Sequence, residues 1–411
     1  MSAETDTPAG AARALRSTTA VRERARQLLA RARAGASEGF AVNDGALALA
    51  ASTVAELTRA RFPDGRIPYH SRWRHFEAGG VDRAGQLDVL LGPVDAAVRA
   101  RAQIDLALVS VLLDAGAGPQ WRYREAASGQ EFARSEGLGV ASFHAFTAGL
   151  FSSDPAQPLR VDAAGLAALT AAQLGAAFQV SEANPLVGLE GRAALLRRLG
   201  AVLAAQPDVF GIAGRPGGLF DALTAHGGGT VAAHDILVLL LDTLSGIWPA
   251  QNTIGEQALG DCWRHPAVTG EGLTAGWMPF HKLSQWLTYS LLEPFEWAGV
   301  RVTGLDALTG LPEYRNGGLL IDAGVLRPLP TDWATRPWQA GDEFIVEWRA
   351  LTVALLDELA PLVRTELGLS AQQMPLACVL EGGTWAAGRL LAQRLRDGLP
   401  PLNIVSDGTV F

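Results

Sequence analysis

Helical periodicity recurs along the chain and limits the folds that it can adopt. Apolar residues three and four positions apart predict amphipathic helices, and one longer apolar stretch predicts a buried helix. The predicted helices span residues 19–34, 45–61, 88–115, 163–178, 191–205, 232–248 and 343–363. The strands that we expect are few and short, among them residues 319–322. The pattern therefore predicts a mainly α fold with a few short β-strands.

No internal repeat, low-complexity linker or other feature marks a clear domain boundary. Of the 411 residues, 48% are hydrophobic and 18% are charged, which is a globular composition with ample material for a core. We therefore expect residues 1–411 to form a single compact unit, in which residues 1–18 are flexible.

Composition also excludes several classes of protein. No apolar run reaches the roughly 18 to 20 residues that a membrane span needs, and the N-terminus lacks the apolar region of a secretory signal. The net charge is −8 without a long basic block, which argues against a broad nucleic-acid-binding surface. The two cysteines, Cys262 and Cys378, are far apart in the sequence and form no C-x-x-C pair. This sparse use of cysteine is typical of proteins of a reducing cytoplasm. We expect a cytoplasmic protein that binds neither nucleic acid nor membrane.

Lys282 is the single lysine among 34 basic side chains, and all the others are arginine. A position that keeps lysine in such a chain is a candidate for a site that needs a compact ammonium group or an amine that can lose its proton. The alternative is one surface lysine that has survived by chance. We expect Pro279 at the first position of the helix that carries Lys282. Gln285, Trp286 and Tyr289 should then lie on the same side of that helix.

Several motifs for cofactors and metals are absent. The lysine is preceded by His281 and followed by Leu283, so it is not part of a phosphate-binding Walker loop. Neither G-x-S-x-G nor H-E-x-x-H occurs. His70 and His75 could bind a metal with a nearby acid, but their spacing does not place both on one helical face. We expect no metal and no other cofactor.

A second candidate site is the segment Glu313-Tyr314-Arg315 in a loop bounded by proline and glycine. A carboxylate there can stabilise a developing cation or orient a water molecule, and an arginine can bind a phosphate or carboxylate with two parallel hydrogen bonds. The alternative is that Glu313 and Arg315 are surface charges of the loop. Spacing alone leaves both interpretations open.

Five strings of the sequence lie at residues 70–80, 184–192, 281–291, 308–318 and 406–411. They resemble the uracil catabolism protein 4 family of bacteria and fungi, and the resemblance covers nearly the whole chain. The family belongs to a pathway in which uracil is converted to its nucleotide and the pyrimidine ring is opened. The resulting ribosylurea-type intermediate must then release urea. The resemblance implies this pathway of pyrimidine degradation but does not by itself imply a reaction.

Four strings, at residues 185–192, 280–285, 308–315 and 343–349, carry a second resemblance. Their order resembles that in the queuosine salvage proteins, which cleave the N-glycosidic bond of a nucleoside 5′-phosphate on a helical, DNA-glycosylase-like fold. In that family, an aspartate that precedes Tyr-Arg is the catalytic carboxylate. The corresponding residue here is Glu313, which is one methylene longer, so its reach and its role stay open.

Together these resemblances predict a hydrolase, an N-ribosidase that converts ribosylurea, or its 5′-phosphate, to urea and ribose or ribose phosphate. Glu313 would stabilise the oxocarbenium-like transition state or activate water. Tyr314, His70 or His75 would protonate the leaving group, and Lys282 would anchor substrate oxygens. The expected catalytic residues are Glu313, Lys282 and Tyr314, and the expected substrate-binding residues are Arg315, His70, Arg72, Trp73, His75, Phe76, Arg192 and Arg349. For Arg192 and Arg349 the alternative is a structural ion pair, and for Trp73 and Phe76 it is a place in the core.

Two alternatives remain. In the first, Lys282 forms a Schiff base with an aldehyde or an opened sugar of the same pathway. In the second, the protein is not catalytic and binds a pathway intermediate or a pathway enzyme.

Overall fold

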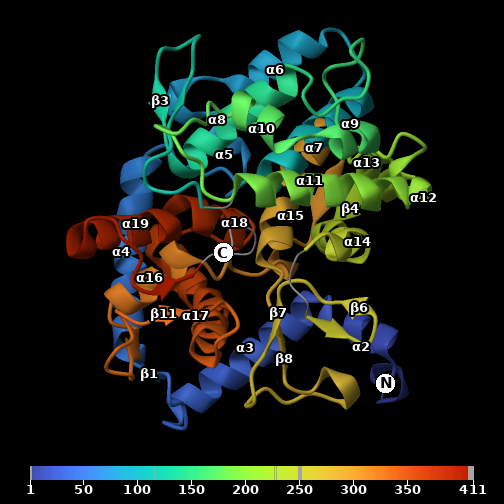
Figure 1. The fold of residues 1–411 in the computed structure, drawn as a ribbon. Helices are drawn as coiled ribbons and strands as arrows, with labels where there is room; N and C mark the ends of the chain where they lie inside the picture. The colour runs from blue at the N-terminus through green and yellow to red at the C-terminus, as the bar shows by residue number, and fades with distance from the viewer. Residues whose placement is uncertain (1, 115, 226, 228, 249–251, 406–411) are drawn as a thin grey trace. The chain divides into compact units, whose positions relative to one another are not determined.

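The computed structural model describes residues 2–114, 116–225, 227, 229–248 and 252–405 (Figure 1). Most of these residues are helical, and the strands are two or three residues long and pair only in two-stranded sheets. The prediction of a mainly α fold with a few short strands is therefore confirmed, whereas the likeness to DNA-glycosylase-like folds stays a prediction. Among the described helices, none is both long enough and apolar enough to cross a membrane. The family string at 406–411 lies outside the described residues.

The chain divides into two compact units. The first lies within residues 1–70, 250–285 and 304–405, and the second contains residues 71–249 and 286–303. We expected a single unit because no linker marks a boundary. Each unit combines segments that are distant in the sequence, and one division falls inside a helix, between Gln285 and Trp286. A boundary of this kind leaves no trace in local composition.

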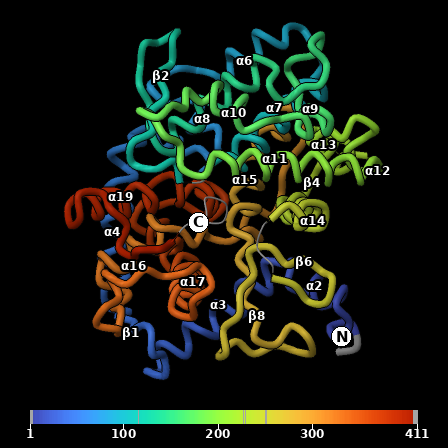
Figure 2. Tube along the Cα trace, in the orientation of Figure 1, coloured from blue at the N-terminus to red at the C-terminus, as the bar shows by residue number. Residues whose placement is uncertain are grey.

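The first unit is built on long helices. The helices in it are α1 (Ser2–Thr5), α2 (Pro8–Leu15), α3 (Thr18–Arg33), η1 (Asp44–Ala46), α4 (Leu47–Arg61), η4 (Gly272–Thr274), the start of α15 (Lys282–Trp297), η5 (Leu305–Ala307), α16 (Tyr314–Asp322), α17 (Glu343–Leu367), α18 (Leu376–Val379), the π-helical η6 (Leu380–Thr384) and α19 (Trp385–Arg396). α17 packs against α3 and α4, and α16 packs against α19, as the trace in Figure 2 also shows. The predicted helices at 19–34, 45–61 and 343–363 correspond to α3, α4 and α17 and are confirmed.

Short strand pairs complete the first unit. The pairs are β1 (Phe40–Val42) with β10 (Leu326–Pro328), β5 (Thr253–Ile254) with β6 (Gln257–Ala258), β7 (Cys262–Arg264) with β8 (Trp277–Pro279), all antiparallel, and β11 (Pro337–Trp338) with β12 (Asn403–Ile404), which is parallel. Two of them, β1 with β10 and β11 with β12, join segments that are distant in the sequence. We expected residues 1–18 to be flexible. The structure instead forms α2 there and buries Ala11, Ala12 and Leu15 against Trp277 and other apolar residues.

Two predicted elements of the first unit are wrong. Residues 319–322 are not a strand but the last turn of α16, which begins at Tyr314. Pro279 is not the first residue of a helix, because it ends β8 and α15 begins only at Lys282. Between them His281 adopts a left-handed backbone conformation with φ of 51°, which turns the chain from the strand into the helix.

The second unit is also helical. Its helices are α5 (Trp73–Phe76), η2 (Ala78–Gly80), α6 (Arg83–Leu91), α7 (Ala96–Leu112), α8 (Arg134–Thr147), α9 (Ala163–Ala168), α10 (Ala171–Ala177), α11 (Leu189–Ala204), α12 (Pro207–Phe210), α13 (Gly218–Thr224), α14 (Ala233–Leu244), η3 (Ser245–Ile247) and the remainder of α15. Two strand pairs complete it: antiparallel β2 (Tyr123–Arg124) with β3 (Glu131–Phe132), and parallel β4 (Thr230–Ala232) with β9 (Arg301–Thr303). The helix predicted at 163–178 is divided into α9 and α10, because Thr170 and Gln173 form a capping box that starts a new helix.

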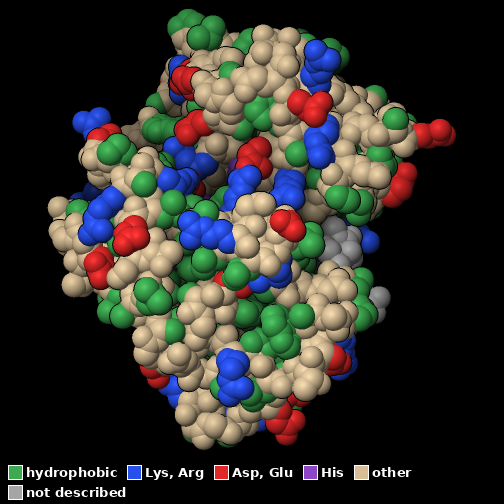
Figure 3. All heavy atoms as spheres, turned by 90° about the vertical axis from the view of Figure 1, so that its left-hand side faces the viewer, with side chains coloured by type: hydrophobic (Ala, Val, Ile, Leu, Met, Phe, Trp, Pro, Cys, Tyr) green, Lys and Arg blue, Asp and Glu red, His purple; other side chains and the backbone are tan. Residues whose placement is uncertain are grey.

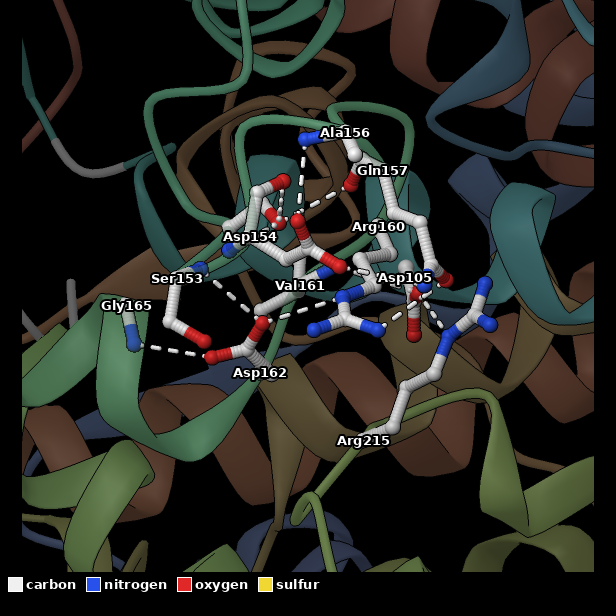
Figure 4. Close-up of polar contacts among 11 residues, drawn as sticks. Asp105, Ser153, Asp154, Ala156, Gln157, Arg160, Val161, Asp162, Gly165 and Arg215 are labelled. Carbon is white, nitrogen blue, oxygen red and sulfur yellow. Dashed lines mark hydrogen bonds and ion pairs between the residues drawn. The ribbon is translucent and has the colours of Figure 1, made fainter.

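A buried aspartate on α7 fastens a long loop of the second unit (Figure 4). Asp105 accepts hydrogen bonds from the backbone N–H of Val161 at 3.1 Å and of Gly217 at 2.7 Å, and from Nε of Arg215 at 2.6 Å. Burial raises the pKa of Asp105 to about 6 even though these partners oppose the shift. These interactions occupy both carboxylate oxygens, which is typical of a structural role.

On the face of the molecule drawn in Figure 3, basic side chains are interspersed with acidic ones.

Candidate functional site

Asp261 and Arg349 fix the start of the helix that carries Lys282. The backbone N–H of Lys282 donates to Oδ2 of Asp261 at 2.9 Å, and the Arg349 guanidinium donates to both oxygens of Asp261 at 2.7 Å. Trp263 donates to the same carboxylate at 2.7 Å. Burial raises the pKa of Asp261, but the charge and hydrogen bonds of Arg349 outweigh it and hold this pKa far below the usual range. An ionised aspartate therefore caps α15 and orients Lys282, whose side chain is half-buried.

Arg349 was expected to bind substrate. The structure places its guanidinium, which is fully buried, in this ion pair with Asp261 and over the ring of Phe280 at 4.0 Å. Two of its nitrogens are thereby committed to the aspartate. The geometry supports a role in positioning Lys282.

The loop before Glu313 is fastened to the same helix. Nε2 of Gln285 donates to the hydroxyl of Thr309 at 2.8 Å, and the backbone N–H of Thr309 donates to Oε1 of Gln285 at 3.3 Å. Gln285 and Thr309 are both buried, so this pair joins the first turn of α15 to the loop without exposure to water. Lys282 and the Glu313 loop are thus held to one another through Gln285.

Glu313 is the N-cap of α16. Its carboxylate accepts hydrogen bonds from the backbone N–H of Arg315 at 2.8 Å and of Asn316 at 2.6 Å, which fixes the orientation of both oxygens. Asn316 is held in turn, because its side chain donates to the Leu311 carbonyl at 3.0 Å and accepts from Thr384 at 2.8 Å. Glu313 therefore begins a helix, which explains why residues 319–322 are helical.

The electrostatics of Glu313 combine opposing effects. Burial raises its pKa, whereas the two N–H donors and then the positive charges of Lys282 and His70 lower it, and the net pKa lies above the usual value. A carboxylate with a raised pKa is a stronger base toward water. Lys282 and His70 are distant from Glu313 in the sequence, but both belong to the first unit and both favour the ionised form of its carboxylate.

Tyr314 and Arg315 lie in the first turn of α16. Burial, and then the charge of Glu313, raise the pKa of Tyr314 to about 12, so its phenol is protonated at neutral pH. Arg315 is half-buried and donates from Nη1 to the Gly398 carbonyl at 3.3 Å. Both residues stand next to the candidate carboxylate, as the sequence implies.

His70 pairs with a glutamate that the sequence did not indicate as a site residue. Its Nδ1 lies 2.8 Å from Oε2 of Glu381, whose Oε1 accepts from Arg61 at 3.0 Å. Glu381 belongs to η6, the π-helical segment before α19, and the His70 ring lies 6.4 Å from that of Trp385. Single π-helical turns occur frequently at functional sites. The string Glu381-Gly-Gly-Thr-Trp385 marks this segment in the sequence, but it does not indicate His70 as the partner.

Five expected binding residues lie in the second unit rather than in the first, which contains Glu313. Arg72 is fully buried, donates to Ser110 at 2.6 Å and forms an ion pair with Asp114 at 2.8 Å. Arg192 donates to the carbonyls of Leu113 at 3.1 Å, Gly116 at 3.1 Å and Val187. Burial lowers the pKa of Arg192 to about 10. The contacts of Arg192 in the structure are those of an arginine that holds loop backbone.

The three remaining expected residues of the second unit are Trp73, His75 and Phe76. Trp73 donates from Nε1 to the Ser290 carbonyl at 2.9 Å, a carbonyl that α15 leaves available because Pro294 has no N–H. Phe76 is buried and its ring lies 5.3 Å from that of Trp73. His75 meets the edge of Trp286 at 5.7 Å. These aromatic contacts are those of a packed core.

Among the described residues, no group of three or more His, Cys, Asp or Glu side chains is arranged to hold a metal ion.

Known proteins are similar in sequence to this protein over most of its length. The family described as "Protein of unknown function (DUF1688)" matches residues 14–411. The chain belongs to this family. A relative in Schizosaccharomyces pombe, named "Protein urg3", is 40% identical over 402 residues, which cover 95% of this chain and 96% of the relative. "Uracil catabolism protein 4" of Lachancea kluyveri is 41% identical over 379 residues, which cover 84% of this chain and 85% of the relative.

These relatives confirm the family that the sequence resembles. In this member of the DUF1688 family, the first unit contains six of the residues described above. They are His70, Lys282, Glu313, Tyr314, Arg315 and Glu381. The likeness to queuosine salvage proteins stays a prediction.

Proposed function

We propose that this protein acts in uracil catabolism as an N-ribosidase that hydrolyses ribosylurea, or its 5′-phosphate, to urea and ribose or ribose phosphate. A relative that is 41% identical carries the name "Uracil catabolism protein 4", which supports the pathway. The reaction rests on one observation. Glu313 is a carboxylate fixed by two backbone donors, has a raised pKa, and is acted on by the charges of Lys282 and His70.

Cleavage of the bond between C1′ and nitrogen passes through a state in which positive charge develops on the sugar. An anionic Glu313 near C1′ stabilises that charge, and its raised pKa suits it to accept a proton from the attacking water. Its orientation is set before substrate binds, because the N–H groups of Arg315 and Asn316 hold both oxygens.

The cations of the site account for substrate binding. Lys282 stands at the first residue of α15, where Asp261 fixes its backbone, and Arg315 stands next to Glu313. An ammonium and a guanidinium bind the oxygens of a phosphate or a sugar through charge-assisted hydrogen bonds. In this role Lys282 remains charged and forms no covalent bond to the substrate.

Exchange of Glu313 for Gln tests the proposal. Glu313→Gln keeps the size of the side chain and one acceptor for the helix start but removes the charge and the base. We expect urea release from ribosylurea 5′-phosphate to fall by a factor of about 100 or more, while the free energy of unfolding falls by only about 1 kcal/mol.

A matched control separates the two effects. Asp95 caps α7 through the N–H of Val98 at 2.8 Å, and it lies in the second unit. Asp95→Asn should cost a similar amount of stability and leave urea release unchanged. If Glu313→Gln retains most of its urea release, the protein does not use Glu313 as proposed, and a binding role without catalysis becomes the better account.

A further inference from the structure

We infer that His70 and Glu381 form the proton-donating pair for the leaving group, with His70 as the acid and Glu381 as its positioning residue. This inference rests on the proposed function, because it concerns the ureido group that leaves the sugar. The sequence left Tyr314, His70 and His75 as equal candidates for the donor. The surroundings of His70 separate it from the other two.

The pair is held from both sides. Nδ1 of His70 lies 2.8 Å from Oε2 of Glu381, and each side chain is only 12% exposed. Arg61 donates to Oε1 of Glu381 at 3.0 Å and also to the backbone carbonyls of Glu381 and Gly382. The arginine therefore fixes the carboxylate, and the carboxylate fixes the imidazole ring.

The backbone around the pair is equally constrained. The N–H of His70 donates to the carbonyl of Ala377 at 3.0 Å, just before the π-helical turn that carries Glu381. That turn lies against α4 and contains two glycines. A Cβ atom on Gly383 would lie 2.5 Å from the carbonyl oxygen of Val54, so only glycine fits this approach. The π-helical turn and its glycines thus bring Glu381 to His70.

The protonation of Glu381 sets the role of each ring nitrogen. Burial raises the pKa of Glu381, but the hydrogen bond and charge of His70 and the charge of Arg61 outweigh it, so the pKa lies below the usual value. An ionised carboxylate only accepts hydrogen bonds. Nδ1 of His70 must then carry a hydrogen, and Nε2 is the atom at which the ring gains and loses a proton.

His70 and Glu313 are joined through the π-helical turn that holds Glu381. Thr384 of that turn donates to the Asn316 side chain at 2.8 Å, and the Asn316 N–H donates to Glu313 at 2.6 Å, so both candidate groups belong to one connected part of the first unit. In the step that we propose, the bond between C1′ and nitrogen breaks and its electron pair goes to the ureido group, which takes the proton from Nε2. Water adds to C1′ and gives a proton to Glu313. Exchange with solvent then restores His70 and Glu313, and the net reaction is hydrolysis.

The alternative donor in the first unit suits this step less well. Burial, and then the charge of Glu313, raise the pKa of Tyr314 to about 12, so its phenol gives up a proton with difficulty. His75 lies in the second unit and packs edge-on against Trp286.

Two substrates test the inference. Ribosylurea needs a proton on its leaving group, whereas a p-nitrophenyl riboside releases a stable anion that needs none. We expect His70→Asn to slow urea release about 100-fold or more and to leave nitrophenol release nearly unchanged. Glu381→Gln should lower kcat for ribosylurea at least about tenfold with little effect on KM, and Glu381→Asp should recover part of the loss. Glu313→Gln should slow both substrates.

A second readout does not depend on the artificial substrate. Added imidazole should restore urea release to His70→Ala, because it replaces the missing acid, while a purely structural defect would not respond. The matched control is His144→Asn. His144 is bound to Glu125 at 2.6 Å in the second unit, and its loss should change neither rate.

The outcomes separate the two proposals. No urea from the folded wild-type protein refutes the proposed function and removes the basis of this inference. Urea release by the wild type, together with equal losses on both substrates for His70→Asn and no rescue by imidazole, refutes the inference alone. Selective loss on ribosylurea with imidazole rescue supports both.

Discussion

The buried pair of Asp261 and Arg349 gives a quantitative test of how the site is held together. Asp261→Asn keeps the shape of the side chain but replaces one of the two oxygens that face Arg349 by an NH2 group. The acceptor then loses its charge, and Arg349, which is fully buried, loses its counter-ion. The N–H of Lys282 and the Nε1–H of Trp263 also face a weaker acceptor.

The expected loss is large because the remaining charge is buried. Removing one partner of a buried ion pair costs about 3–5 kcal/mol, chiefly because the other charge is left without compensation. The weakened helix start adds up to about 1 kcal/mol, and the two terms share Asp261, so they do not simply add. We expect Asp261→Asn and Arg349→Met each to lower the free energy of unfolding by about 3–5 kcal/mol. The double variant should lose at least about 2 kcal/mol less than the sum of the single losses.

Equilibrium unfolding in guanidinium chloride measures all four corners of this cycle. Arg101 and Asp221 form a pair of similar geometry, with two hydrogen bonds of 2.8 Å, but their side chains are 30% and 51% exposed. Asp221→Asn should therefore cost no more than about 1 kcal/mol. Additive losses in the buried cycle, or a loss for Asp261→Asn as small as that for Asp221→Asn, would show that the buried pair does not stabilise the start of α15.

The same pair gives a direction with pH. The pKa of Asp261 is lower in the folded protein than its value of about 3.9 in an unfolded chain. Its contribution to stability is then fully present above that unfolded value and is lost as pH falls toward the folded pKa. Asp261→Asn should remove this part of the acid sensitivity.

Three further predictions concern stability and chemistry. Burial raises the pKa of Glu293 from 4.5 to about 7. Its contribution to the free energy of unfolding is therefore greatest below pH 4.5 and falls by about 3 kcal/mol as pH rises to about 7. Glu293→Gln should abolish that fall, which chemical unfolding at pH 5 and pH 8 measures. Gly388→Ala should lower the free energy of unfolding by about 1–3 kcal/mol, because the added Cβ would collide with the carbonyl oxygen of Arg315. Gly191→Ala in α11 is the control: no atom lies within 4 Å of the added Cβ, so the free energy of unfolding should rise by about 0.5–1 kcal/mol in the same assay. Borohydride with ribosylurea 5′-phosphate should leave Lys282 unmodified by mass spectrometry, and an adduct there would support the Schiff-base alternative.

Local signals predicted the elements that depend on local sequence. The helices α3, α4 and α17 follow from apolar periodicity, because each buries one or more faces along many turns. α16 was missed because it starts with a side-chain contact. Glu313 caps the helix, and the two glycines within it weaken its helical signal. Residues 319–322 were therefore predicted as a separate strand.

The site shows the same limit. The sequence indicated Lys282 and Glu313, and the structure joins their two segments through the hydrogen bonds between Gln285 and Thr309. The sequence could not indicate Asp261 as the partner of Arg349, because the two lie 88 positions apart. It also could not indicate Glu381 as the partner of His70, because these two lie 311 positions apart. Neither pair has a local signature, because tertiary packing alone brings the partners together. The division into two units was missed for the same reason.

The central claim is that the protein breaks the bond between C1′ and the ureido nitrogen. Its most direct test is incubation of the purified, folded protein with ribosylurea 5′-phosphate in water enriched in ¹⁸O, followed by mass spectrometry of urea and sugar. The account predicts catalytic release of urea without label, together with ribose phosphate that carries ¹⁸O at C1′ when the reaction is stopped before the sugar exchanges its oxygen with water. No urea above the uncatalysed background, or label in the urea-derived product instead of the sugar, would contradict it.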